Sequence, residues 1–358
     1  MKIAIDISQV VYGTGVSVYT ENLVRSLLAI DDENQYLLYG GSLRKKSKLV
    51  EFTENLTGNF DCKLYNFPPT LTDIMWNRLH IINLEQIIGQ FDVVHTSDWA
   101  EPPSKIPKVT TIHDLAPINY PGETHPKVVS AHKKRLKLVK AESAHIIVPS
   151  LSVKKELIDY GFHSSKIAVI PESQNPNIKK VTNTEITRVK NKFNIVGDYI
   201  VGWGTSKRKN YERSFEAFKK VKTHLNLSTF VLLGVASHNT SDNMIATGYV
   251  SDADVSALYS GASALAYPSI TEGFGIPILD AFACDCPVVT SRESSMPEVA
   301  GNAAILVDPF SIKSIADGLV SAVKQRNKLM QKSHSQLKKF SWEKTARETL
   351  KVYKLAAN

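Results

Sequence analysis

Two carboxylates flank a glycine-rich loop that could hold an anionic ligand. Glu272 and Asp280 are separated by seven residues in the segment TEGFGIPILD at positions 271–280. Pro277 suits the first turn of a helix, where its missing N–H would have no partner. The glycines let the backbone approach a ligand, and free N–H groups at a helix start favour a phosphate or an anionic sugar oxygen. The alternative is an ordinary helix entry in which Asp280 only favours the helix dipole.

A second glycine-containing loop, YGTGVS at positions 12–17, carries Gly13 and Gly15. It follows an expected strand, Lys2–Ser8, and opens an expected helix, Val16–Ala29. It lacks the third glycine of a dinucleotide-binding fingerprint, and no acidic residue ends a second strand at the expected distance. A plain tight turn is the competing interpretation.

Polar residues also stand at the ends of two other expected strands. His113 ends the strand Val109–His113, while His95 and Asp98 lie at and just past the end of Asp92–Thr96. Ligands of doubly wound sheets bind outside the carboxyl ends of the strands, so these positions are candidates for binding. A histidine at a strand end more often makes a structural hydrogen bond.

Neither acidic nor thiol groups form a convincing metal site. Asp252 and Asp254 resemble an Asp-x-Asp metal motif, but Ser251 followed by an acid three residues later is typical of a helix cap. Cys284 and Cys286 lack the spacing and the histidine partners of a zinc site, so we expect them in the core.

Short apolar strands alternate with amphipathic helices along the whole chain, which is typical of parallel sheets covered on both faces. The expected strands are 2–8, 35–39, 92–96, 109–113, 145–149, 167–171, 199–203, 230–235, 264–266, 287–290 and 304–307. The expected helices are 16–29, 78–88, 128–141, 153–160, 211–223, 252–259, 277–284, 312–324 and 342–355. The polar, turn-rich segment Glu172–Asn183 suits a hinge between two domains.

Composition supports a globular chain of two domains. The 358 residues are 43% hydrophobic and 22% charged, which argues against disorder, and a chain of this length usually divides into two cores. The 43 Lys and Arg exceed the 35 Asp and Glu, for a net charge of +8. Three cysteines and the short apolar start favour a cytoplasmic protein without a signal peptide, and no apolar run is long enough to span a membrane.

The segment EGFGIPILDAFACDCPVV at positions 272–289 closely resembles the Glu-x7-Glu signature of glycosyltransferase family 4, retaining enzymes of the GT-B fold. The likeness continues through TIHDL at 111–115, TGYVSD at 247–252, SSMPEVAGNA at 294–303 and VDP at 307–309. It implies an α/β protein with two Rossmann-like, doubly wound domains and a cleft between them. Residues 1–171 would bind the acceptor and 172–341 the donor, and the helix within 342–358 is expected to pack back on the first domain.

The resemblance also implies roles for single residues. Glu272 and His113 would act at the transferred sugar, and Asp280 would hold the ribose. The backbone around Gly273, Phe274, Gly275 and Ile276 would bind the donor sugar. Lys209, with Lys207 or Arg208, would bind the diphosphate, which Gly13 and Gly15 would approach. His95 and Asp98 would lie on the acceptor side.

The sequence departs from the family pattern at two points. Asp280 replaces the second glutamate and is one methylene shorter, although any carboxylate can accept hydrogen bonds from ribose. In GWGTSKRKN at 202–210, Trp203 or Gly204 occupies the place of the usual arginine, so either Lys207 or Arg208 must supply the second cation. An ordinary helix start would disfavour so many cations, because they oppose the dipole.

The function predicted from these residues is transfer of a hexose from GDP-mannose or a UDP-sugar to an acceptor hydroxyl in glycan or glycolipid synthesis, with no cofactor and no metal. Alternatives are a nucleotide-sugar epimerase of the same architecture, a dinucleotide oxidoreductase and a non-catalytic sugar-nucleotide-binding protein. The missing third glycine argues against the oxidoreductase.

The basic composition of one expected helix indicates the kind of acceptor. Lys127, Lys133, Lys134, Arg135, Lys137 and Lys140 crowd the expected helix 128–141, and a second basic group occupies 44–48. Nucleic-acid binding would call for interleaved aromatic residues or a recognition module, and neither is present. An anionic membrane surface on the cytoplasmic side and a lipid-linked acceptor suit such a helix, although a merely solvated face has the same composition.

Overall fold

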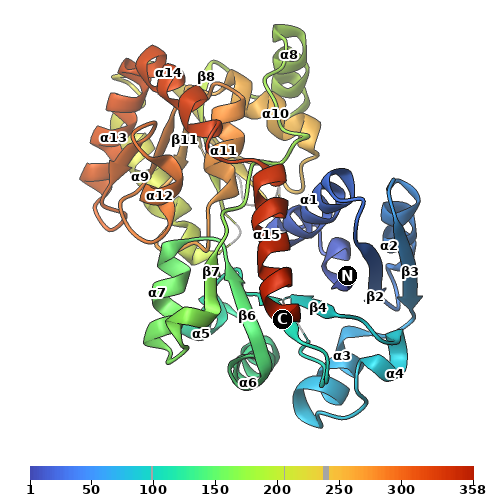
Figure 1. Ribbon diagram of the computed structural model, residues 1–358. Coiled ribbons are helices and arrows are strands. Elements are labelled where there is room, and N and C mark those ends of the chain that lie inside the picture. Colours follow the sequence, from blue (N-terminus) through green and yellow to red (C-terminus); the bar gives the residue numbers. More distant parts are fainter. Residues whose placement is uncertain (98–99, 205, 237–241) are drawn as a thin grey trace. The chain divides into compact units, whose positions relative to one another are not determined.

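The computed structural model describes residues 1–97, 100–204, 206–236 and 242–358 (Figure 1). The chain divides into two compact units. The first contains Met1–Glu172 together with Trp342–Asn358, and the second contains Ser173–Ser341. Each unit is built around its own parallel sheet, so the predicted pair of Rossmann-like domains is confirmed.

The first unit contains, within the described residues, a seven-stranded sheet of order β3-β2-β1-β4-β5-β6-β7. Every neighbouring pair of strands is parallel. The strands are β1 (Lys2–Asp6), β2 (Gln35–Gly41), β3 (Phe60–Tyr65), β4 (Val93–Ser97), β5 (Lys108–Thr111), β6 (Ser143–Val148) and β7 (Ile167–Val169). The strand order reverses between β1 and β4, which makes the loops after these strands candidate ligand sites.

Helices cover both faces of this sheet because its strands are apolar on both sides. Ile3 and Ile5 of β1 pack in one cluster with α1, whereas Ala4 between them packs with Trp76 and Ile88 on the other face. The α-helices are α1 (Gly15–Ile30), α2 (Lys46–Glu54), α3 (Pro69–Thr72), α4 (Glu85–Ile88), α5 (Ala116–Asn119), α6 (Pro126–Glu142) and α7 (Leu151–Asp159). The chain also forms the 3-10 helices η1 (Ser8–Val11), η3 (Pro121–Glu123) and η4 (Ser164–Lys166) and the π-helix η2 (Asp73–Arg78).

The last helix, α15 (Trp342–Ala357), belongs to the first unit although it follows the whole of the second. It packs against α1, β4, β5 and β6. Val352 and Tyr353 are buried in the same cluster as Leu23 and Leu27 of α1. Apolar residues at helical spacing on both helices therefore close one face of the first sheet.

The second unit contains, within its described residues, a six-stranded parallel sheet of order β10-β9-β8-β11-β12-β13. The strands are β8 (Asp198–Trp203), β9 (Leu227–Leu233), β10 (Met244–Ala246), β11 (Ala264–Tyr267), β12 (Val288–Ser291) and β13 (Ile305–Val307). The helical elements are α8 (Asn183–Lys192), η5 (Lys207–Lys209), α9 (Tyr211–Val221), α10 (Asp252–Gly261), α11 (Ile276–Ala283), α12 (Met296–Ala300), α13 (Ile312–Lys324) and α14 (Arg326–Leu337).

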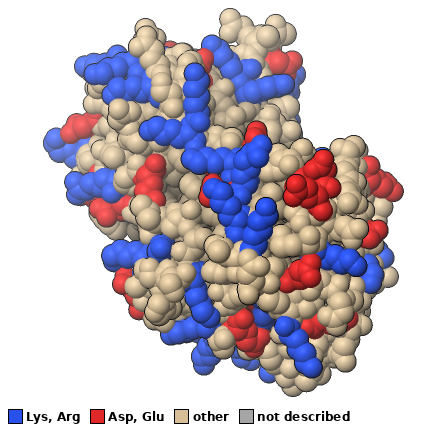
Figure 2. All heavy atoms as spheres, in the orientation of Figure 1, with Lys and Arg blue, Asp and Glu red and all other residues tan. Residues whose placement is uncertain are grey.

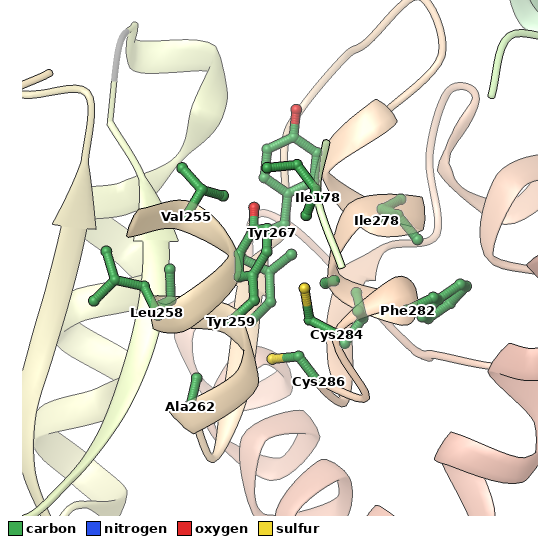
Figure 3. Close-up of a cluster of buried hydrophobic side chains, with 14 of the residues drawn as sticks. Ile178, Val255, Leu258, Tyr259, Ala262, Tyr267, Ile278, Phe282, Cys284 and Cys286 are labelled. Atoms are coloured by element: carbon green, nitrogen blue, oxygen red, sulfur yellow. The ribbon is translucent and has the colours of Figure 1, made fainter. Parts of the chain in front are cut away.

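Two apolar clusters fill the faces of the second sheet. α9 and α13 contribute to one, and α8, α10, α11 and α12 contribute to the other. Cys284 and Cys286 are buried in the latter, beside Tyr259 and Phe282, which confirms their prediction as core residues (Figure 3). Burial also raises the pKa of the Cys286 thiol to about 12, so it stays protonated.

The prediction of a helix over Arg78–Ile88 is wrong. The chain instead forms η2 up to Arg78 and the short α4 from Glu85. Between them, His80 and Ile82 adopt the left-handed backbone region, with φ of 51° and 61°, which interrupts a helix. The apolar spacing of this segment suggested a helix, but several of its apolar side chains are exposed to solvent.

Candidate active site

The cationic and acidic loops of the second unit meet because of the strand order. β8 and β11 are neighbours at the point where the order reverses, and their register pairs Ala264 with Ile200 and Ala266 with Gly202. The loop after β8 carries Lys207, Arg208 and Lys209, and the loop after β11 carries Glu272. Parallel strands end at the same edge, so two loops far apart in sequence become adjacent.

Hydrogen bonds join these two loops directly. The backbone N–H of Ile270 donates to the carbonyl of Arg208 at 2.8 Å. Asn210 has a left-handed backbone, with φ of 60°, and its buried side-chain amide donates to the carbonyl oxygens of Pro268 and Pro309 at 3.0 and 2.6 Å. The η5 turn is therefore anchored to the acidic loop before any ligand binds.

The carboxylate of Glu272 lies at the centre of the joined loops. Lys209 Nζ is 2.7 Å and the Tyr267 hydroxyl 2.8 Å from its Oε1, and Arg208 is 3.4 Å from its Oε2. Glu272 is 8% exposed. Lys207 is exposed, so Lys209 and Arg208 are the cations of η5 that contact the carboxylate.

These partners keep the buried carboxylate charged. Burial alone would raise the pKa of Glu272, but the charges of Lys209 and Arg208 and the hydrogen bonds from Lys209 and Tyr267 hold the pKa below its ordinary value. The site is thus a carboxylate and two cations in one place. A phosphate could compete for the cations and a sugar hydroxyl for the carboxylate.

Two serines fix the backbone on both sides of Glu272. Ser294, whose φ is 57°, accepts a hydrogen bond from the Glu272 N–H at 3.2 Å and donates to the Glu272 carbonyl at 2.9 Å. Ser295 donates to the carbonyl oxygens of Glu272 and Phe274 at 3.0 and 2.8 Å. The segment after β12 therefore fixes the backbone of the acidic loop through the hydroxyl groups of these two serines.

The helix start predicted from the glycines and Pro277 is confirmed. Gly275 precedes α11 with φ of 111°, in the left-handed region that a residue with a side chain rarely adopts. Phe274 is buried against Phe340, with ring centroids 5.7 Å apart. Gly273, Phe274, Gly275 and Ile276 thus contribute backbone at the beginning of the helix rather than polar side chains.

Asp280 is one turn into α11 and is buried, at 9% exposed. Its Oδ1 accepts a hydrogen bond from the backbone N–H of Asn175 at 2.8 Å, and the side chain of Asn175 bonds to Asp252. Burial raises the pKa of Asp280 to about 8; the Asn175 bond opposes this rise and the charge of Asp252 adds to it. Glu272 and Asp280 therefore differ in charge near pH 7, a contrast that the sequence did not reveal.

In the first unit, His113 lies two residues beyond β5 and is paired with Glu172. The His113 Nδ1 is 3.0 Å from Glu172 Oε1, and the ring of Tyr19 meets the imidazole edge-on at 4.6 Å. Glu172 is buried and ends the first unit. The sequence interpretation missed Glu172 because a carboxylate in a turn-rich linker has no motif of its own.

His95 does not match its expected place on the acceptor side. It is 2% exposed, and its ring nitrogens contact the Tyr353 hydroxyl at 2.6 Å and the Thr111 hydroxyl at 2.7 Å. Burial lowers its pKa to about 3, so the ring stays neutral in the core. Asp98, expected beside it, lies outside the described residues.

The loop that carries Gly13 and Gly15 is exposed and ends in a helix cap. Gly13 has φ of 68°, and its N–H donates to the hydroxyl of Ser17 at 2.9 Å. Thr14 caps α1 reciprocally with Ser17. The backbone N–H groups of Gly13 and Thr14 are therefore both engaged within the loop.

The predicted helix cap at residues 251–254 is confirmed. The hydroxyl of Ser251 accepts a hydrogen bond from the Asp254 N–H at 3.3 Å. Asp254 is paired with Arg188 and Lys192 of α8, which explains the acid without a metal. No group of three or more His, Cys, Asp or Glu side chains that could hold a metal ion occurs among the described residues.

Replacement of Asp280 by Asn should change how stability depends on pH. Because the folded chain holds a proton that an unfolded aspartate loses above about pH 4, the stability of the parent protein should fall as pH rises from about 4 to 8. Asn does not titrate, so the stability of the variant should not fall in this way. The free energy of unfolding of Asp280→Asn, relative to that of the parent, should therefore rise by more than about 1 kcal/mol between pH 5 and pH 8. Urea denaturation at several pH values measures it. The exposed Asp317→Asn is the control, and a pH-independent difference for Asp280→Asn would contradict the assignment.

The chain is similar to several known proteins. The chain is 27% identical over 368 residues to the O-antigen chain mannosyltransferase B of Escherichia coli, covering 96% of each chain. It is 31% identical to the O-antigen chain mannosyltransferase RfbU of Salmonella typhimurium, covering 57% of each. The crystal structure of Anabaena HepE with UDP and glucose shares the fold with a TM-score of 0.71, at 14% identity and 98% coverage of both chains.

Two family models match the two halves of the chain. The model for glycosyltransferase family 4 matches residues 13–173, and the model for glycosyl transferases group 1 matches residues 200–340. The chain therefore belongs to the group 1, family 4 glycosyltransferases of GT-B fold.

Proposed function

We propose that this glycosyltransferase moves a hexose, with retention, from a nucleoside diphosphate sugar to an acceptor hydroxyl, and that GDP-mannose is the donor. The observation that carries the proposal is the buried Glu272 held against Lys209 and Arg208 beside the start of α11. Support for mannose comes from the O-antigen mannosyltransferase that matches nearly the whole chain. A UDP-sugar is the alternative donor, because HepE was solved with UDP and glucose.

In this mechanism the second unit stabilises charge that develops as the glycosidic bond breaks. Lys209 and Arg208 would neutralise the departing diphosphate, and Glu272 would accept a hydrogen bond from the sugar. Asp280 would accept hydrogen bonds from the ribose, which would favour its charged form. The proposal includes no protein nucleophile, so the acceptor would attack from the leaving-group face and a phosphate oxygen would take its proton.

The first unit is proposed to serve the acceptor and the sugar. Glu172 would hold the His113 imidazole in one orientation through the contact at Nδ1. The exposed loop at Gly13 and Gly15 would contribute backbone groups. No metal enters this scheme, because the two cations and the backbone amides supply the positive charge.

Lys209→Ala should weaken GDP binding by about 1.5–3 kcal/mol, the usual value of a charge-assisted hydrogen bond. Isothermal titration calorimetry with GDP and UDP measures it and also ranks the two bases. Lys219→Ala, on the exposed face of α9, is the control and should bind as the parent does. Equal affinity for GDP in both variants would remove Lys209 from the diphosphate site.

Glu272→Ala should reduce mannosyl transfer at least 100-fold, while its affinity for GDP changes little, because the carboxylate serves the sugar rather than the diphosphate. Mass spectrometry of transfer from GDP-mannose to methyl α-mannoside, with EDTA present, measures the rate.

Asp280→Ala should chiefly raise the KM for the donor. Near-normal turnover in Glu272→Ala would refute the catalytic assignment, and loss of parent activity in EDTA would refute metal independence.

We further propose a lipid-linked acceptor at an anionic membrane surface. Lys133, Lys137 and Lys140 are exposed at offsets that keep them on one side of α6. On the face of the molecule that Figure 2 shows, Lys and Arg side chains lie interspersed with Asp and Glu. Arg135, expected among the lysines of α6, is instead buried beside Glu101 and donates to the carbonyl of Thr111. No helix in the described ranges is long and apolar enough to cross a membrane.

Exposed apolar residues next to α6 add to this support. η2 packs against α6, and His80 Nε2 is 2.7 Å from Glu142 Oε1 at the end of that helix. The large apolar side chains exposed in η2 and in the residues on either side of it are Leu71, Ile74, Leu79, Ile81 and Ile82. Apolar groups beside cations suit the interface of a bilayer with anionic headgroups.

Replacing Lys133, Lys137 and Lys140 by Glu should abolish binding to anionic vesicles, since each basic residue near such a surface contributes about 1 kcal/mol. Co-sedimentation with phosphatidylglycerol vesicles at rising salt measures it, and binding should fade as salt screens the attraction. The matched control replaces the exposed Lys313, Lys324 and Lys328 by Glu, which changes net charge equally. Equal recovery of the parent with anionic and neutral vesicles would leave a soluble acceptor instead.

A further inference from the structure

Tyr267 is a buried tyrosine whose hydroxyl reaches the charged centre of the donor site. It ends β11 and is 1% exposed. Its ring lies in the apolar cluster with Val255, Tyr259 and Ile278, and its hydroxyl is directed away from the two cysteines of that cluster (Figure 3). The core therefore fixes the ring while the polar tip extends to the loop after the strand.

The hydroxyl of Tyr267 is both a hydrogen-bond donor and a hydrogen-bond acceptor. It donates to Glu272 Oε1 at 2.8 Å and accepts from Lys209 Nζ at 2.6 Å. The Lys209 ammonium also lies 4.9 Å from the centre of the Tyr267 ring. Three groups from the ends of two neighbouring strands thus share one set of hydrogen bonds.

A bound diphosphate would change this arrangement. Lys209 and Arg208 are the two cations of η5 that contact Glu272, and both are proposed to turn toward the phosphates. Glu272 would then lose charged partners while remaining buried, which is costly for a carboxylate. The hydroxyl of Tyr267 stays beside Glu272, because the tyrosine ring is packed in the core and cannot turn toward the diphosphate.

We infer that Tyr267 is a positioning residue of the donor site: its hydroxyl orients the Glu272 carboxylate and remains its donor when Lys209 turns to the diphosphate. The expected effect on turnover rests on the proposed function, whereas the hydrogen bond between Tyr267 and Glu272 does not. Burial, the negative charge of Glu272 and the hydrogen bond to it raise the pKa of Tyr267 well above 10, so the phenol stays a donor throughout the working pH range.

The test compares Tyr267→Phe with Tyr199→Phe in the full-length protein. Tyr199 is an equally buried tyrosine of the same sheet, but its hydroxyl donates to the backbone carbonyl of Leu258 at 2.9 Å. Both variants keep the ring, and thermal unfolding reports whether each remains folded. The first readout is the carboxyl carbon of Glu272, followed by NMR after selective ¹³C labelling of glutamate and assigned with Glu272→Gln.

Tyr267→Phe should move the titration midpoint of Glu272 to higher pH by about one unit, because a donor that favours the charged form is lost. Tyr199→Phe should leave the midpoint in place. This readout needs neither donor nor acceptor, so it decides the hydrogen bond even if the proposed function is wrong. An unchanged midpoint in Tyr267→Phe would overturn the inference.

The second readout is transfer from GDP-mannose to methyl α-mannoside. Tyr267→Phe should lower kcat about tenfold with less than a threefold change in the KM for the donor, because Lys209 keeps its own contacts to the diphosphate. Equal losses of kcat in both tyrosine variants would show a merely structural effect and overturn the inference. If the parent protein binds no nucleotide, the proposed function fails, and the NMR titration still stands on its own.

Discussion

Burial of one charged carboxylate, that of Glu272, determines what must surround it. Such a group is costly away from water unless cations and hydrogen-bond donors compensate. Here they come from η5, from the end of β11 and from the backbone near Ser294. These segments meet because β8 and β11 are neighbours in the sheet, so the loops that follow them lie at the same edge. The charged state of the buried carboxylate therefore depends on the strand order of the sheet.

The two units share a topology but use it differently. In the second unit, the loops beside the reversal of strand order hold opposite charges in contact. In the first, the loop after β1 is closed by the helix cap between Thr14 and Ser17, and the His113–Glu172 pair lies after other strands. The same topology thus holds a buried cluster of two cations and a carboxylate in one unit and a His–Glu pair in the other.

The sequence predicted what depends on local pattern. The strand–helix alternation, the start of α11 at Gly275 and Pro277, the cap at Ser251 and the burial of Cys284 all follow from spacing and residue type. What it could not predict depends on tertiary contact. His95 looks the same in sequence whether its nitrogens face a ligand or, as here, Thr111 and Tyr353.

Misassignments and omissions have the same origin. The segment 78–88 has helical spacing, yet left-handed residues at His80 and Ile82 break it, and no glycine marks the break. Tyr267 reads as one more aromatic residue in a buried strand. Its polar role appears only when Lys209, 58 positions earlier, is placed beside it.

The return of α15 to the first unit has a consequence for the order in which the chain assembles on the ribosome. Strands β1 to β7 are synthesised early, but the face of their sheet that α15 covers stays open until residues 342–358 emerge. The second unit, being continuous in sequence, can complete its core first. At a synthesis rate of about 5–20 residues per second, translating that unit leaves apolar residues of the first sheet uncovered for roughly 10–30 s. During this interval the apolar face of the first sheet stays exposed to water, so the synthesis of α15 sets the time at which the first unit can complete its core.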